Sequence, residues 1–156
     1  NKPDRSVPLD LDSSTFNFAI VASRFNADIA DKLIGGALEA LEKTGTQRGD
    51  VRIVSVPGSY ELPLAAKRLI DAGAIDAVIA LGCVVRGQTP HFEHVIHAAT
   101  EGLLRVSLAT NTPVTLGVLT VENYKQALER AGGSLGNRGF EAAVAAIEIV
   151  RQLRDI

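Results

Sequence analysis

Residues 77–95 decide the fold of this chain, and they read AVIALGCVVRGQTPHFEHV. Their first part, residues 77–85, is an apolar run without a charge, which is typical of a strand buried on both faces of a sheet. Residues 86–88 form a turn, Thr89 suits a helix N-cap, and Pro90 suits the first helical position. Unpaired backbone N–H groups and the positive end of a helix dipole meet at such a turn, which therefore favours an anion.

On both sides of this stretch, apolar strands alternate with segments whose apolar residues recur at helical spacing. No hairpin signal interrupts the alternation, and Asn26 is the candidate cap of the first helix. The pattern predicts a three-layer α/β sandwich of the flavodoxin-like type, with a four-stranded parallel sheet and right-handed crossovers. We expect further strands at 16–22, 51–56 and 114–119, helices at about 27–44, 59–72, 90–109 and 140–154, and a short helix capped by Thr120 that ends at Gly132 and Gly133.

The composition is that of a globular protein. The 156 residues are 46% hydrophobic and 22% charged, so we expect a single domain over 16–156 after an N-terminal arm, 1–15, that is disordered or packed on a neighbour. A net charge of −2 with scattered basic residues argues against nucleic-acid binding. No apolar run approaches the roughly 20 residues that span a bilayer. In the absence of a signal peptide the cytoplasm is the expected compartment, with a removed organelle transit peptide as the alternative.

The sulfur and imidazole groups give little support for a metal site. Cys83 is the only cysteine, which excludes an intrachain disulfide and a cysteine-based zinc cluster and favours a small buried filler. The three histidines, His91, His94 and His97, follow one another on one helix without an obvious carboxylate as a further ligand. We therefore expect no metal, and we expect His94 and His97 to be packing or surface residues.

Parallel α/β sheets bind ligands beyond the carboxyl ends of their strands. That rule indicates the loops at 23–26, 57–61, 86–91 and 119–123. The turn before His91 either binds phosphate or is an ordinary strand-to-helix turn, and the residues alone leave both readings open. It resembles a P-loop but lacks the lysine, so nucleotide hydrolysis is not expected.

Several side chains near these loops have a structural and a functional interpretation. His91 lies beside the turn and is the candidate for proton transfer. Phe25 is either packed or stacked on a flat heterocycle, and Glu61 either complements a helix dipole or accepts hydrogen bonds from a polyol. Arg130 and Arg138 flank a glycine-rich segment and are either surface residues or a phosphate clamp.

Four motifs together resemble one protein family. They are SRFN at 23–26, VPGSYELP at 56–63, LGCVVRGQTPHFEHV at 81–95 and GVLTVENYKQALERAGGSLGNRG at 117–139. In order and spacing they are similar to the 6,7-dimethyl-8-ribityllumazine synthase family, and the resemblance covers the chain from about Phe16 to its end.

The resemblance implies the penultimate step of riboflavin synthesis. The family condenses 5-amino-6-(D-ribitylamino)uracil with 3,4-dihydroxy-2-butanone 4-phosphate to the lumazine, phosphate and water, without a metal or an organic cofactor. The predicted strand-end loops carry no lysine, which agrees with an imine formed by the substrate's own amine.

The resemblance also implies roles for individual residues. Phe25 would stack on the pyrimidine, His91 would transfer protons, and Arg130 would contact phosphate from the adjacent subunit. Leu116 and Arg138 would reach across with it. The family more often has Phe at position 116, so that ligand affinity rather than chemistry is expected to differ there. It more often has Lys at position 138, where Arg138 keeps the charge but changes its reach and geometry. The remaining substrate-binding positions are Ser59, Tyr60 and Glu61 for the ribityl chain, Val84 and Val85 for the ring, and Gln88 and Thr89 for the phosphate.

Family members assemble as pentamers, many of which form shells of 60 subunits, and riboflavin synthase is the implied partner. The short loop at 132–139 resembles that of shell-forming members, whereas the N-terminal arm, with Pro3 and Pro8, would oppose packing between pentamers. Two other functions are considered: a non-catalytic flavin or lumazine carrier, and, without the resemblance, a flavodoxin-like FMN-binding module. A carrier would need neither His91 nor Arg130.

Overall fold

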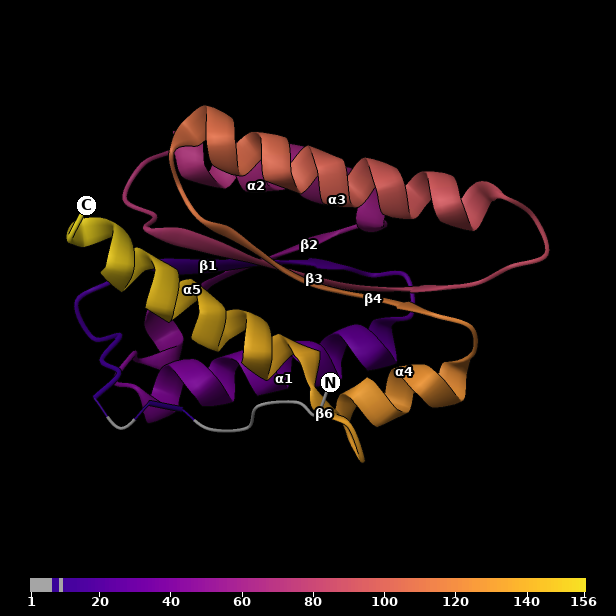
Figure 1. The fold of residues 1–156 in the computed structure, drawn as a ribbon, viewed down its shortest axis with the longest axis horizontal. Helices are drawn as coiled ribbons and strands as arrows, with labels where there is room; N and C mark the ends of the chain where they lie inside the picture. The colour runs from indigo at the N-terminus through magenta and orange to yellow at the C-terminus, as the bar shows by residue number, and fades with distance from the viewer. Residues whose placement is uncertain (1–6, 9) are drawn as a thin grey trace.

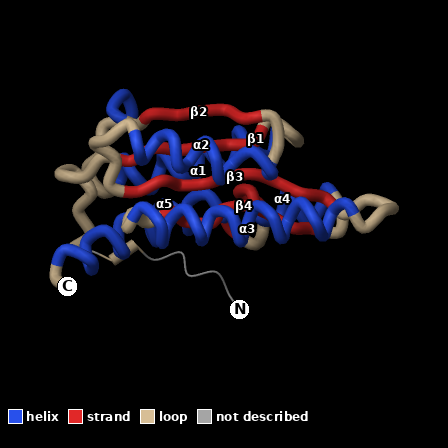
Figure 2. The backbone as a smooth tube through the Cα atoms, turned by 90° about the horizontal axis from the view of Figure 1, so that it is seen from above, coloured by secondary structure: helices blue, strands red, loops and turns tan. Residues whose placement is uncertain are grey.

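The computed structural model describes residues 7–8 and 10–156. One sheet contains four parallel strands in the order β2-β1-β3-β4, which Figure 2 shows side by side. The predicted α/β fold class is therefore confirmed. The elements of the sheet and its crossovers are β1 (Phe18–Ser23), α1 (Ala27–Lys43), β2 (Arg52–Val56), α2 (Leu62–Asp71), β3 (Ala77–Val85), α3 (His91–Thr110), β4 (Val114–Val121), α4 (Tyr124–Arg130) and α5 (Arg138–Arg154), with one-turn 3-10 helices η1 (Arg48–Asp50) and η2 (Ser59–Glu61).

Helices cover both faces of this sheet, with α2 and α3 on one side and α1, α4 and α5 on the other (Figure 1). Side chains of the central strands alternate between the two faces. Phe18 and Ile79 belong to the core under α1 and α5, whereas Ala19 and Val78 belong to the core under α2 and α3. Every residue of β1 is buried, which explains why these strands are apolar without alternation in the sequence.

Two helix starts differ from the sequence-based expectation. Thr89 does not cap α3, because the helix begins at His91, with Pro90 in the N-cap position and no side-chain cap. Asn26 does hold the N-cap position of α1, but in a left-handed conformation with φ 58° and without a side-chain cap. Its amide instead donates to the carbonyl of Cys83 at 3.2 Å, so this residue ties the loop after β1 to β3.

The region after β4 was predicted least well. The strand continues to Val121, so Thr120 is a strand residue, and Asn123 caps α4 by accepting a hydrogen bond from Gln126 N at 2.9 Å. The helix ends at Arg130, before the glycines. The expected absence of a hairpin was wrong: β5 (Ala131–Gly133) and β6 (Gly136–Asn137) pair antiparallel. Strands this short carry no period that a sequence pattern could show.

The end of the predicted N-terminal arm packs on its own chain. Leu11 is 8% exposed and Ser13 is fully buried, with Ser13 N donating to the carbonyl of Thr44 at 2.9 Å. Residues 1–6 and 9 of the predicted arm lie outside the described residues. Among the helices of the described part, none is long and apolar enough to cross a membrane.

Candidate active site

A cavity of about 610 Å³ lies where β1 and β3 end and α3 begins. That volume suits a small organic ligand. Its walls come from segments that are far apart in the sequence: the loop after β1, the η2 turn after β2, the end of β3 and the first turns of α3. The lining residues are Phe25, Gly58, Ser59, Tyr60, Glu61, Cys83, Val84, Val85, Gly87, Thr89, His91, Phe92 and Val95.

The structure brings most of the sequence-predicted site residues together in this cavity. Gln88, Leu116, Arg130 and Arg138 are not among its lining residues. Those that line it are Phe25, Ser59, Tyr60, Glu61, Val84, Val85, Thr89 and His91. They meet because the carboxyl ends of parallel strands lie at one edge of the sheet.

One wall is formed by the η2 turn. Gly58 is fully extended, and the backbone N–H of Glu61 donates to its carbonyl at 3.2 Å, which closes the turn. Ser59 points inward and is 4% exposed, whereas Tyr60 is 66% exposed. Glu61 holds the N-cap position of α2 without capping it. A Cβ on Gly58 would lie 3.2 Å from Glu61 Oε2, so the carboxylate lies back over the glycine.

The opposite wall carries the anion-favouring end of α3. Glu93 N makes the first intrahelical bond, to the carbonyl of Pro90 at 3.1 Å. The N–H groups of His91 and Phe92 precede that bond and therefore face the N-terminal end of the helix, where the dipole is positive. His91, Thr89 and Gln88 are all exposed beside this end. The arrangement suits an anion next to an imidazole.

Arg86 fixes this turn through contacts that the sequence analysis did not predict. Its Nε lies 2.8 Å from Glu122 Oε2, and its Nη1 lies 3.5 Å from Glu93 Oε1. The guanidinium carbon is 4.8 Å from the centre of the Phe92 ring, which lines the cavity. Because two carboxylates neutralise Arg86, this arginine is occupied in holding the turn. The only sequence signal for this pairing is a basic residue at 86 with acidic residues at 93 and 122.

Cys83 is a buried residue, as predicted, at 1% exposure. Burial, with a smaller contribution from the charge of Asp28, raises the pKa of its thiol to about 11. The thiol therefore stays protonated at neutral pH and is a poor nucleophile. The chemistry of the cavity must come from other groups.

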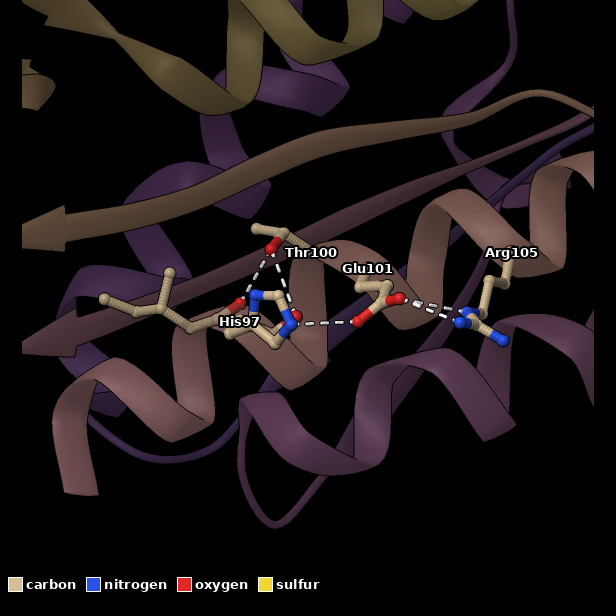
Figure 3. Close-up of polar contacts among 5 residues, drawn as sticks. His97, Thr100, Glu101 and Arg105 are labelled. Carbon is tan, nitrogen blue, oxygen red and sulfur yellow. Dashed lines mark hydrogen bonds and ion pairs between the residues drawn. The ribbon is translucent and has the colours of Figure 1, made fainter. Parts of the chain in front are cut away.

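The other two histidines lie on the exposed side of α3. His97 Nε2 is 2.9 Å from Glu101 Oε2, and Arg105 Nη2 is 2.8 Å from Glu101 Oε1, so the three side chains form a row along the helix (Figure 3). Arg105, and then His97, hold the pKa of Glu101 below its usual range. Within the described residues no group of three His, Cys, Asp or Glu side chains could hold a metal ion. His94 is exposed as well.

The predicted residues outside the cavity lie on other parts of the surface. Leu116 is on the edge strand β4 and is 47% exposed. Arg130 ends α4, and its Nη1 donates to the carbonyl of Gln126 at 3.1 Å. Arg138 begins α5, where its Nε lies 3.4 Å from Glu141 Oε2. Among the described residues of a single copy, no arginine lines the cavity.

Comparison with known proteins agrees with the motifs. The family model described as 6,7-dimethyl-8-ribityllumazine synthase matches residues 15–154. A 6,7-dimethyl-8-ribityllumazine synthase of Nitratidesulfovibrio vulgaris (strain DP4) is 45% identical over 152 residues, which are 97% of both chains. The protein of the same name from Nitratidesulfovibrio vulgaris (strain DSM 19637 / Miyazaki F) is 43% identical over the same shares. The chain therefore belongs to the 6,7-dimethyl-8-ribityllumazine synthase family.

Proposed function

We propose that this chain condenses 5-amino-6-(D-ribitylamino)uracil with 3,4-dihydroxy-2-butanone 4-phosphate to 6,7-dimethyl-8-ribityllumazine, phosphate and water. The observation that carries the proposal is the cavity, in which three of the four family motifs meet at the carboxyl ends of the strands. The fourth motif contributes Glu122, which holds the turn that forms one cavity wall. The family membership supplies the identity of the reaction.

One part of the lining suits the pyrimidine ring and its ribityl chain, and another part suits the phosphate. This division fits two substrates held side by side. Phe25 is 70% exposed at the cavity and offers a face on which a pyrimidine can stack. Val84 and Val85 supply the apolar wall for the ring. The ribityl hydroxyls lie within reach of the η2 turn, where Ser59, Tyr60 and Glu61 offer two hydroxyls and a carboxylate.

The phosphate of the second substrate belongs at the N-terminus of α3, beside Gln88 and Thr89. His91 adjoins both parts and transfers protons while the amine of the uracil attacks the ketone, phosphate leaves, and the second nitrogen closes the ring. The described cavity lining contains no lysine, which supports an imine made by the substrate's own amine. Most of the acceleration comes from holding the two substrates in contact.

The first test is the reaction itself. The purified protein is mixed with both substrates, and lumazine fluorescence and phosphate release are followed against the uncatalysed condensation. We expect acceleration with one phosphate per lumazine. A protein that binds lumazine or riboflavin without accelerating the reaction would instead be a carrier, and this result would overturn the proposal.

Arg130 completes the phosphate site from an adjacent copy. The proposal is supported by its place outside the cavity of its own chain, where its side chain is 34% exposed beside Glu129. Leu116 and Arg138 cover the same cavity from that copy. We expect Arg130→Ala to raise KM for the butanone phosphate about 10-fold or more, the loss expected for a charge-assisted bond, with little change in KM for the uracil. An unchanged KM for the phosphate substrate contradicts this assignment.

A mixing experiment tests whether the site is shared between subunits. Co-expressed His91→Ala and Arg130→Ala chains that assemble at random produce interfaces with both residues native in about a quarter of cases. At low butanone phosphate, the mixture should therefore recover about a quarter of native activity. Two separately purified variants that are mixed after assembly are the control. No recovery in the co-expressed sample would place Arg130 and His91 in the same subunit's site.

We further propose a pentamer as the unit of assembly and a shell of 60 subunits as its closed form. Apolar side chains exposed on α2, α3 and β4 support coverage by another copy, since large exposed apolar patches are rare on monomers. Leu64, Leu104 and Leu108 are 65%, 59% and 74% exposed. Sedimentation of the 16.5 kDa chain should show a single species of shell size. A sharp species of five chains excludes the shell, and a monomer excludes both forms.

A further inference from the structure

A buried hydroxyl below the cavity has no role in the reaction described so far. Ser23 is the last residue of β1 and is fully buried. Its Oγ has no hydrogen-bond partner among the residues that the structure describes. Buried hydroxyls are almost always hydrogen-bonded, because an unpaired one loses its contact with water without compensation. The Ser23 hydroxyl therefore indicates a polar partner other than the residues that the structure describes.

Gly82 on β3 shows where that partner lies. A Cβ on Gly82 would be 2.7 Å from Ser23 Oγ and 3.1 Å from Ser59 Oγ. The two hydroxyls, one from β1 and one from the η2 turn, thus converge on the same side of Gly82. The two oxygen atoms therefore lie less than about 6 Å apart, a separation that one water molecule can bridge with hydrogen bonds of about 2.8 Å to each of them. A glycine at this position keeps side-chain atoms out of the space between the hydroxyls.

The sheet geometry connects this point to the cavity. Side chains at every second residue of a strand lie on the same face, so Ala80 and Val84 flank Gly82 on one face of β3. Ala80 belongs to the core under α2 and α3, and Val84 lines the cavity. Ser59 is 4% exposed and also lines the cavity. The point between the hydroxyls is therefore just below the cavity floor.

We propose that Ser23 and Ser59 hold one water molecule above Gly82, and that Ser23 orients the Ser59 hydroxyl through this water. A serine hydroxyl rotates freely unless its partners fix it, and a bridging water can donate to one hydroxyl and accept from the other. The fixed Ser59 hydroxyl then presents a defined donor or acceptor to the polyol chain of the uracil substrate. Ser23 is a positioning residue, and this role rests on the proposed function of Ser59 in binding that chain.

Ser23→Ala removes the hydroxyl and leaves the backbone of β1 unchanged. We expect the Kd for the ribityl-bearing lumazine and the KM for the uracil to rise about 3- to 10-fold, the range of one hydrogen bond. KM for the butanone phosphate and the Kd for 6,7-dimethyllumazine, which lacks the ribityl chain, should stay as in the native protein. Ser13→Ala is the matched control, because Ser13 is a fully buried serine on the opposite side of the sheet, and it should change neither affinity.

Crystal structures of the native protein and of Ser23→Ala provide the direct readout. Density for a water within about 3.2 Å of both hydroxyls, absent from the variant, supports the proposal. A Ser23 hydroxyl bonded to a protein group, or native ribityl affinity in Ser23→Ala, overturns it. If Ser59→Ala also leaves ribityl affinity unchanged, the assignment of Ser59 fails with it. If the native protein does not catalyse the condensation, the proposed function fails while the density still reports on the water.

Discussion

Replacing Gly139 by alanine is expected to destabilise the folded chain by about 3 kcal/mol or more, the upper range of an overpacked core. Gly139 is buried in the first turn of α5, where this helix crosses α1. A Cβ there would lie 2.0 Å from the carbonyl oxygen of Leu33 and 2.9 Å from its Cα. These are backbone atoms in the middle of a helix, so no rotamer change relieves the clash. The whole of α1 or α5 would have to move.

Gly35→Ala is the matched control for this prediction. Gly35 lies on the same α1 helix and is exposed, and a Cβ added to it would have no neighbouring atom within 4 Å. Alanine there should stabilise the chain by up to about 1 kcal/mol through helix propensity. Urea unfolding of native, Gly35→Ala and Gly139→Ala protein at one concentration measures both effects. A Gly139→Ala protein within about 1 kcal/mol of the native one would show that the helices separate easily.

The sequence predicted the sheet well because its central strands carry the strongest signal. β1 and β3 are buried on both faces and appear as apolar runs, and the helices between them have long apolar stripes. The boundaries were less predictable where a hydrogen bond decides them. Thr89 and Thr120 both suit a cap by residue type, yet the structure places the latter in a strand and gives its role to Asn123.

The candidate site was predictable in outline, since strand-end loops must meet at one edge of a parallel sheet. The contacts that shape it were not, because they join residues distant in the sequence. Arg86 and Glu122 follow the ends of the neighbouring strands β3 and β4 and pair there, and Ser23, Ser59 and Gly82 converge from three separate segments. Their convergence depends on side-chain directions that no periodic pattern encodes. The substrates were identified only through the family motifs.

Replacing His91 by alanine is expected to lower kcat about 100-fold, the usual contribution of a general acid–base group. The imidazole is exposed at the start of α3 and lines the cavity, so its loss would remove the proposed proton transfer without opening the core. KM for both substrates should change less than about 3-fold, because the proposed site binds the pyrimidine through Phe25 and the phosphate through the helix N-terminus. Orientation of the two substrates accounts for the rate that remains.

His94→Ala is the control for this prediction, because His94 is exposed on the same helix and is not among the residues that line the cavity. It should retain native kcat, KM and sedimentation. The pH profile adds a second readout: any pH dependence of the native rate that comes from proton transfer by His91 should disappear in His91→Ala. Loss of activity together with loss of the assembly would instead assign His91 a structural role. Retained activity with an unchanged pH profile would assign proton transfer to solvent or to the substrate phosphate, and the cavity would then act through orientation alone.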